Sequence, residues 1–145
     1  RNASSVSLVM IDLDDLKSIN DRLGHNQGDI VLQKVGSILK RNTRASDVVA
    51  RWGGDEFVLL ASDADTERAH IIGERIRAQV NNCRLKLSGE ETTISVSVGI
   101  STYPTNALSA SDLIKRADEA MYNAKGLGKN QVSINPLIYI LPSSH

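Results

Sequence analysis

Two pairs of carboxylates stand where apolar runs of the sequence end or begin. Asp12 and Asp14 follow one short apolar run, and Asp55 and Glu56 come directly before another, after two glycines. If the two runs are neighbouring strands, these side chains converge, and a hard divalent cation would relieve their repulsion. Alternatively, Asp14 or Asp15 caps a helix and Asp55 belongs to a polar turn. That alternative is stronger for either pair alone, whereas both pairs together favour a Mg²⁺ site.

Glycine and lysine residues could bind phosphate close to these carboxylates. Gly53 and Gly54 have no Cβ, so their backbone N–H groups could approach phosphate oxygens, although paired glycines also suit an ordinary hairpin turn. Lys125 and Lys129 flank two further glycines and could neutralise a triphosphate, or could simply complement the end of a helix. The sequence has no Walker A motif, which disfavours the P-loop nucleotide folds.

Asn20 and Asp29 have side chains that could recognise a nucleobase. A carboxylate accepts hydrogen bonds from the N1–H and N2–H₂ groups of guanine, which adenine does not present. On its own, Asp29 is better explained as a residue of the first turn of a helix, where the helix dipole favours an acid.

Hydrophobic periodicity predicts the elements that must position these residues. Continuous apolar runs predict strands at 6–11, 48–51 and 57–61, and strict alternation over 92–100 predicts a half-buried antiparallel strand. Helical spacing predicts helices over 16–23, from about 28 to 39, over 69–80 and over 112–124, with a last strand at 131–134 and an additional strand near Leu85.

This order of elements predicts the fold class. Without its additional helix it is the split β-α-β pattern of ferredoxin-like folds, which nucleotidyl-transferring palm domains also use. We therefore expect an α/β (α+β) palm domain with a central, mainly antiparallel sheet flanked by helices. It should occupy residues 1–135, followed by a C-terminal tail at 136–145.

Composition narrows the classes of function and location. The chain has 145 residues, the size of one domain, and its 17 basic and 17 acidic residues give no net charge, which argues against a nucleic-acid-coating protein. The single cysteine, Cys83, excludes an internal disulfide and suits a reducing compartment. No run approaches the roughly 18 apolar residues of a membrane span. We expect a cytoplasmic protein, or the cytoplasmic module of a longer, membrane-bound one.

Taken together, these motifs resemble those of the GGDEF domains, the diguanylate cyclases. The resemblance covers roughly residues 5 to 134 and is carried by Gly53-Gly54-Asp55-Glu56-Phe57, the run 12–21, Gly24-His25, Gly28-Asp29, the run 95–99, Ala117-Asp118, the run 121–125 and Gly128-Lys129-Asn130. The family joins two GTP molecules into cyclic di-GMP and releases two pyrophosphates. Because each domain holds one GTP, the resemblance implies a homodimer at the moment of reaction.

The resemblance also implies roles for individual residues. Asp12, Asp55, Glu56 and the backbone carbonyl of Leu13 would hold two Mg²⁺ or Mn²⁺ ions per site, with Asp55 and Glu56 as the catalytic residues. The guanine would lie against Asn20 and Asp29. The phosphates would lie against Gly53, Gly54, Lys125 and Lys129.

A second, inhibitory site is implied by Arg44-x-x-Asp47, which by composition alone is simply a surface salt bridge. In the family this motif binds the product, and Arg75 falls where a second arginine of that site is expected. Arginine forks can grip guanine and phosphate with two hydrogen bonds, and aspartate can accept from the donor edge. We therefore expect feedback inhibition by cyclic di-GMP.

Three departures from the family pattern accompany the resemblance. Leu16 replaces a phenylalanine, and Lys129 replaces an arginine, which keeps the charge but loses the two-pronged fork. The sequence begins almost at the first strand, and we expect the family's usual preceding segment and an upstream sensor or dimerisation domain to lie outside it. We expect the catalytic module of a longer protein.

Two other functions compete with the cyclase. The domain could be a non-catalytic receptor for GTP or cyclic di-GMP that signals to a partner, but the presence of Asp55 and Glu56 disfavours this. It could also be a palm-domain cyclase that acts on ATP, which Asp29 disfavours because a carboxylate matches adenine poorly.

Overall fold

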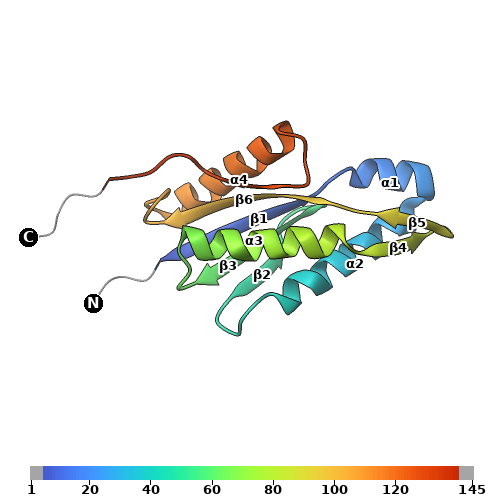
Figure 1. Ribbon diagram of the computed structural model, residues 1–145, viewed down its shortest axis with the longest axis horizontal. Coiled ribbons are helices and arrows are strands. Elements are labelled where there is room, and N and C mark those ends of the chain that lie inside the picture. The colour runs from blue at the N-terminus through green and yellow to red at the C-terminus, as the bar shows by residue number, and fades with distance from the viewer. Residues whose placement is uncertain (1–4, 141–145) are drawn as a thin grey trace, which may run out of the picture.

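The computed structural model describes residues 5–140, which form a five-stranded sheet with helices on both faces (Figure 1). The strand order is β2-β3-β1-β6-β7, and a separate hairpin joins β4 to β5. The strands are β1 (Val6–Leu13), β2 (Val48–Arg51), β3 (Glu56–Ser62), β4 (Arg84–Leu87), β5 (Glu90–Thr93), β6 (Val96–Tyr103) and β7 (Val132–Ile134). The helices are α1 (Leu16–Leu23), α2 (His25–Arg41), α3 (Thr66–Asn81) and α4 (Ala110–Gly126).

Strand β1 lies at the centre of the sheet, antiparallel to β3 on one side and to β6 on the other. Only β7, at the edge, pairs in parallel, with β6. The register places Asp12 opposite Glu56 of β3 and opposite Ser97 of β6. The mixed α/β class with a mainly antiparallel sheet is therefore confirmed, and the register brings one carboxylate of each predicted pair together, Asp12 and Glu56.

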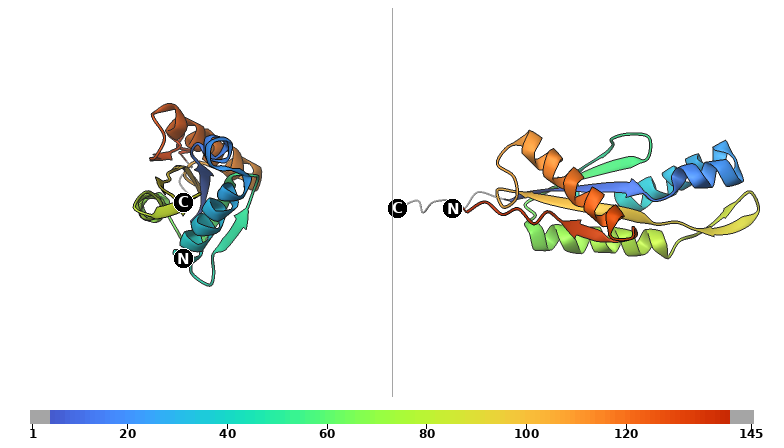
Figure 2. Two further views of the ribbon diagram at one scale, coloured as in Figure 1. Left: turned by 90° about the vertical axis from the view of Figure 1, so that its right-hand side faces the viewer. Right: turned by 90° about the horizontal axis from the view of Figure 1, so that it is seen from above.

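The two faces of the sheet are covered by different helices (Figure 2). Val9 and Ile11 of β1 pack with α1, α2 and α3, whereas Leu8 and Met10 pack with α4. Because side chains alternate along a strand, Asp12 continues the set that faces α4. The same alternation decides which helix can supply it with a counter-ion.

Most predicted elements are confirmed, including the additional strand near Leu85, which is β4. Helix α2 begins at His25, three residues before the predicted start, and only Gly24 separates it from α1. No helix in the described part of the chain is long and apolar enough to cross a membrane.

The prediction of one half-buried strand over 92–100 is wrong in two respects. The segment is divided between β5 and β6, and β6 is buried on both faces. The polar set of the alternation is covered by α4, whose backbone lies so close that a Cβ at Gly99 would overlap the backbone of Ala117 and Met121. Small residues on this face, with Ser97 and Ser101 beside Gly99, permit that approach.

Residues 136–140 of the predicted tail lie along the connection between β6 and α4. The Asn106 side chain donates to the carbonyl of Leu137 at 2.7 Å, and the Tyr139 backbone N–H donates to the carbonyl of Thr105 at 2.8 Å. The Tyr139 hydroxyl donates to Asp112 of α4 at 3.2 Å. The remainder of the tail, 141–145, lies outside the described residues.

Gly99 provides a test of the α4–β6 contact. We expect Gly99→Ala to lower the free energy of unfolding by about 1–3 kcal/mol, because the added methyl group forces two backbones apart. Gly36→Ala is the matched control, because the nearest atom to its new Cβ would be Phe57 Cε2 at 3.8 Å, an ordinary contact in a helix interior. That variant should be more stable by roughly 0.5–1 kcal/mol. Urea unfolding checks both, and equal effects would contradict the close approach.

Candidate active site

Three carboxylates form a compact cluster where β1 ends and β3 begins. Oxygen atoms of Asp12, Asp55 and Glu56 all lie within 4.8 Å of one another. The ladder places Asp12 opposite Glu56, and the backbone N–H of Leu13 donates to the carbonyl of Asp55 at 3.0 Å. The β2–β3 turn is thereby tied to the end of the central strand, which confirms that these residues of the two predicted pairs converge.

The environment of the cluster raises the pKa of two of its carboxyl groups, Asp12 and Glu56, in the metal-free protein. Burial raises the pKa of Asp12 to about 6, and the charges of Asp55 and Glu56 act in the same direction. Burial also raises the pKa of Glu56, helped by the charges of Asp118 and Asp55. A neighbouring cation favours the ionised state of both carboxyl groups.

Lys125 of α4 supplies one such cation. Its Nζ lies 3.1 Å from Asp12 Oδ2 and 3.2 Å from Asp14 Oδ1. Burial acts to lower the pKa of this lysine, but its hydrogen bonds and ion pairs with the two aspartates outweigh that effect and raise it. Lys125 is thus fully charged and partly neutralises the cluster.

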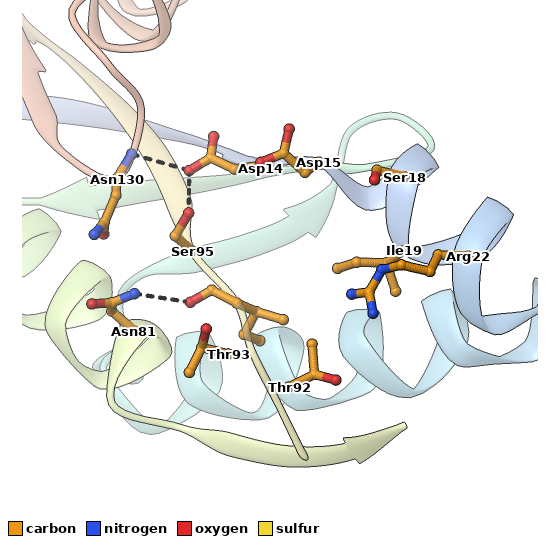
Figure 3. A pocket seen from close by; sticks show the side chains of 11 residues that line it. Asp14, Asp15, Ser18, Ile19, Arg22, Asn81, Thr92, Thr93, Ser95 and Asn130 are labelled. Carbon is orange, nitrogen blue, oxygen red and sulfur yellow. Dashed lines mark hydrogen bonds between the residues drawn. The ribbon is translucent and has the colours of Figure 1, made fainter. Parts of the chain in front are cut away.

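Asp14 belongs to a different arrangement from the other three predicted carboxylates. Its side chain, 1% exposed, accepts hydrogen bonds from the Ser95 hydroxyl at 2.6 Å and the Asn130 backbone N–H at 3.1 Å (Figure 3). It also accepts a hydrogen bond from the Ser97 hydroxyl at 2.7 Å. With the lysine contact, every side of the carboxylate is engaged within the protein. Asp14 therefore joins structural elements and is not part of the three-carboxylate cluster.

The three-carboxylate cluster fits a hard divalent cation. Its donors are all oxygens, as Mg²⁺ and Mn²⁺ prefer. Asp12 Oδ1 is also buried with no hydrogen-bond partner among the described residues, an arrangement that is costly unless a ligand completes it. Leu13 packs its side chain in the core, so its predicted ligand role would come from its backbone.

A pocket of about 370 Å³ opens beside the cluster, between α1, α2 and the β2–β3 turn. Its lining includes Asn20, Asp29, Gly54 and Asp55, so the predicted base-reading residues share this pocket with one member of the carboxylate cluster. The Gly28 backbone N–H donates to Asn20 Oδ1 at 2.9 Å, and a Cβ at that glycine would overlap the asparagine. The glycine thus fixes the orientation of the Asn20 amide.

A second hollow of similar volume lies on the other side of α1 (Figure 3). Ser18 and Arg22 of α1 line it, together with Asn81, Thr93 and Ser95. Of the four carboxylates of the predicted pairs only Asp14 lines it, and the residues predicted to bind the base and the phosphates do not.

Lys129 lies in the loop after α4, at the outer edge of the site. Its Nζ pairs with Asp15 Oδ1 at 2.7 Å, and the backbone of both residues has positive φ, 64° and 60°. Both predicted phosphate-binding lysines are therefore held by carboxylates in this structure. A triphosphate would have to compete with those carboxylates for them.

The Arg44-x-x-Asp47 segment forms a closed turn between α2 and β2. Asp47, 1% exposed in its side chain, accepts from the backbone N–H of Arg44 at 2.9 Å and from that of Ser62 at 3.1 Å. Burial acts to raise the pKa of Asp47, but these hydrogen bonds and the Arg44 charge outweigh it and lower the pKa. The Arg44 guanidinium remains 44% exposed and donates to the carbonyl of Ser62.

Arg75 lies on the face of α3 that is directed toward this turn. It is exposed, and it precedes Gln79 by four residues, so the two share one helix face. Gln79 accepts a hydrogen bond from Asn42, two residues before Arg44, at 2.9 Å. The two arginines of the predicted inhibitory site are therefore on neighbouring elements.

One residue of the first pocket was missed by the sequence reasoning. Arg51, the last residue of β2, lines the pocket and donates to the carbonyls of Gly53 and Gly54. The sequence contains one signal for this role: Arg51 stands directly before the Trp-Gly-Gly turn, where a long side chain can fold back over the turn.

Comparison with known proteins agrees with this geometry. The family described as "Diguanylate cyclase, GGDEF domain" matches residues 1–131. The chain belongs to the GGDEF family. Diguanylate cyclase A of Treponema denticola is 38% identical over 131 residues, which are 90% of this chain and 35% of that protein. Diguanylate cyclase DosC of Escherichia coli K12 is 39% identical over 135 residues, 92% of this chain and 29% of that protein. The chain thus spans about a third of the length of these relatives.

Solved GGDEF domains also share this fold. The GGDEF domain of YfiN (TpbB) from Pseudomonas aeruginosa superposes with a TM-score of 0.87 at 38% identity, covering 92% of this chain and 84% of that one. The GGDEF domain of DgcB from Caulobacter crescentus, in complex with c-di-GMP, gives a TM-score of 0.86 at 30% identity, covering 91% of this chain and 78% of that one.

The pKa of Asp12 provides a test of the cluster's electrostatics. In the metal-free protein we expect the Asp12 carboxyl carbon to titrate near pH 6 by NMR. Lys125→Met should move the midpoint further up, because the lysine opposes protonation. Lys129→Met, which removes an ammonium paired with Asp15, should leave it in place. A midpoint near pH 4 in the unaltered protein would contradict the assignment.

The same shift predicts a pH dependence of stability. Because the folded-state pKa lies above 3.8, the native protein retains a proton that the unfolded chain releases. The Asp12 contribution is therefore complete below about pH 4 and is lost as the pH rises through about 6. Asp12→Asn should remove this component from urea-unfolding curves.

Proposed function

We propose that this GGDEF domain is a diguanylate cyclase that joins two GTP molecules into cyclic di-GMP and releases two pyrophosphates. The observation that carries the proposal is the pocket that Asn20, Asp29 and Asp55 line together, because Asp55 also belongs to the three-carboxylate cluster. Such a pocket can place a nucleobase and the reacting end of the same nucleotide on separate groups. The names of the relatives support the same reaction.

Asn20 and Asp29 orient the nucleotide in this proposal. The Asp29 carboxylate accepts from the N1–H and N2–H₂ donors of guanine, and adenine would leave it without a partner. Gly53 and Gly54 leave open space beside the turn, which admits a phosphate against the backbone. Lys125 and Lys129 approach the phosphates from the opposite side, after exchanging their carboxylate partners for phosphate oxygens.

Asp12, Asp55 and Glu56, with the Leu13 carbonyl, would hold two Mg²⁺ or Mn²⁺ ions. Bound there, the ions would stabilise the developing negative charge on the phosphate oxygens and make a ribose 3′-hydroxyl easier to deprotonate. Glu56 would be a further metal ligand or would assist the removal of that proton. Asp55, which lines the pocket, would hold the ions at the reacting end of the nucleotide.

Two copies of the domain must meet for the reaction, because one pocket holds one nucleotide. We propose a transient homodimer that works in the cytoplasm, where GTP is available, with residues 1–135 as the catalytic domain. The alternative is a receptor that binds GTP or cyclic di-GMP without turnover. The c-di-GMP complex of the DgcB domain is the observation that favours this alternative.

A cyclase assay on a dimerised domain tests the proposal. Bound nucleotide is removed, a dimeric coiled coil is fused to the N-terminus, and product from GTP and Mg²⁺ is measured by chromatography. Asp55→Ala should reduce turnover by more than the roughly 10–100-fold typical of residues that only support a metal ligand. Its fold, checked by circular dichroism, should be unchanged.

The outcomes of that assay separate the candidates. Near-normal turnover in Asp55→Ala would contradict the cluster as the reacting site. No product from the unaltered chain, with tight cyclic di-GMP binding, would establish the receptor instead. Turnover of ATP in place of GTP would overturn the role of Asp29.

We also propose feedback inhibition through Arg44, Asp47 and Arg75. Arg44→Ala should raise the cyclic di-GMP concentration needed for half-inhibition by about 10–100-fold, the effect of losing a charge-assisted hydrogen bond. Arg41→Ala, an exposed arginine at the end of α2, is the matched control. An unchanged inhibition curve for Arg44→Ala would remove the site. Asp47→Ala is unsuitable, because that carboxylate also holds the turn together.

A further inference from the structure

Arg51 folds its side chain back over the turn that follows it. Its Nε donates to the carbonyl of Gly53 at 3.2 Å, and its Nη2 donates to the carbonyl of Gly54 at 2.7 Å. One guanidinium therefore bridges two consecutive peptide groups. Such a fork needs two donors in a fixed plane, which arginine has and lysine lacks.

The turn has little else to hold it. A Cβ at Gly54 would meet no atom within 4 Å, and one at Gly53 would meet only Glu56 Cβ at 3.9 Å, so within residues 5–140 nothing crowds the Cβ position of either glycine. The β2–β3 ladder reaches Trp52, whose backbone N–H donates to the carbonyl of Glu56 at 2.8 Å, and the Gly53 N–H reaches the same carbonyl at 3.3 Å. Within residues 5–140, Arg51 is the only side chain that donates to the two glycine carbonyls.

The other end of the turn is Asp55, a member of the three-carboxylate cluster. Its carbonyl is fixed by the Leu13 N–H, but its position along the turn depends on the two glycines before it. Glycine gives the backbone more freedom than any other residue, so an unsupported Gly-Gly pair would let the following carboxylate move. A displacement of about 1 Å in a reacting group can cost about 10²-fold in rate.

The charge of Arg51 is not used elsewhere in the described part of the chain. It pairs with no carboxylate between residues 5 and 140, although it lines the same pocket as Asp29 and Asp55. The backbone carbonyls of the turn are its partners. This distinguishes it from Arg84, which is equally exposed in a hairpin strand but pairs with Glu91.

We propose that Arg51 is a positioning residue of the active site, whose guanidinium fork fixes the Gly53-Gly54 turn and so holds Asp55 beside Asp12 and Glu56. Its role in catalysis rests on the proposed function. Its role in ordering the turn does not.

Two variants and one control test this role. Arg51→Ala removes the fork and the charge, Arg51→Lys removes the fork alone, and Arg84→Ala is the control at an exposed arginine outside the site. Three quantities are measured on the full chain: amide hydrogen exchange at 53–55, the affinity for Mn²⁺ without nucleotide, and kcat and KM in the dimerised assay.

We expect both Arg51 variants to behave alike. Exchange at 53–55 should rise at least about tenfold, Mn²⁺ binding should weaken several-fold, and kcat should fall by up to about 10²-fold while KM for GTP stays within about threefold. Arg84→Ala should match the unaltered protein throughout. Because Arg51 is exposed, the fold should persist in every variant.

Two results would overturn the proposal. Full recovery by Arg51→Lys, with a raised KM in Arg51→Ala, would show a point charge acting on the nucleotide. Unchanged exchange at 53–55 in both variants would show that the turn is ordered without the fork. If the unaltered chain makes no cyclic di-GMP, the proposed function fails, but exchange and Mn²⁺ affinity still decide the role of Arg51.

Discussion

The buried carboxylate of Asp14 joins four segments of this domain. Asp14 directly follows the last residue of β1. Its carboxylate accepts hydrogen bonds from Ser95 and Ser97 at the start of β6 and from the backbone N–H of Asn130 in the loop before β7. It also pairs with the ammonium of Lys125 in α4. A carboxylate taken out of water without such partners would be strongly destabilising. The four segments can therefore satisfy Asp14 only in one relative arrangement. That arrangement also places α4 against the end of β1, where the three-carboxylate cluster lies.

Lys125 connects this buried junction to the reacting site. Its ammonium lies between Asp12 and Asp14, so one charge is shared by a buried structural carboxylate and a carboxylate of the proposed cation site. If a divalent cation bound Asp12, the lysine would keep Asp14 and would have a hydrogen-bond donor free to point into the site. A phosphate oxygen could accept from that donor. The lysine can thus exchange one anionic partner for another without leaving the junction that anchors it.

Local patterns were enough to predict the elements and the cluster, but not the directions of individual side chains. The apolar run before Asp12 and the glycines before Asp55 identify two strands and a turn, and their pairing then follows from topology. Asp14 is two residues from Asp12 on the same face, and nothing in that spacing says that it turns to Ser95 and Ser97, 81 and 83 residues away. The alternation at 92–100 led to the wrong prediction of a half-buried strand. It shows only which residues are polar, whereas the burial of β6 depends on how closely α4 approaches it. The engagement of Lys125 and Lys129 by carboxylates, and the fork of Arg51, likewise depend on atomic distances that spacing does not carry.

In the proposed reaction, groups on the two faces of the sheet bind different parts of the nucleotide. The pocket with Asn20 and Asp29 lies on the side of α1 and α2, whereas Lys125 approaches from α4 on the other face. A nucleotide that uses both must cross the end of β1, where Asp12 and the Asp55 turn stand. In this arrangement the base sets how deeply the nucleotide enters the pocket, and the end of β1 sets the position of its reacting phosphate. A small displacement of the Asp55 turn would therefore change the geometry of the reacting groups. A single domain can position one nucleotide in this way, so the proposed reaction needs a second nucleotide held by another copy.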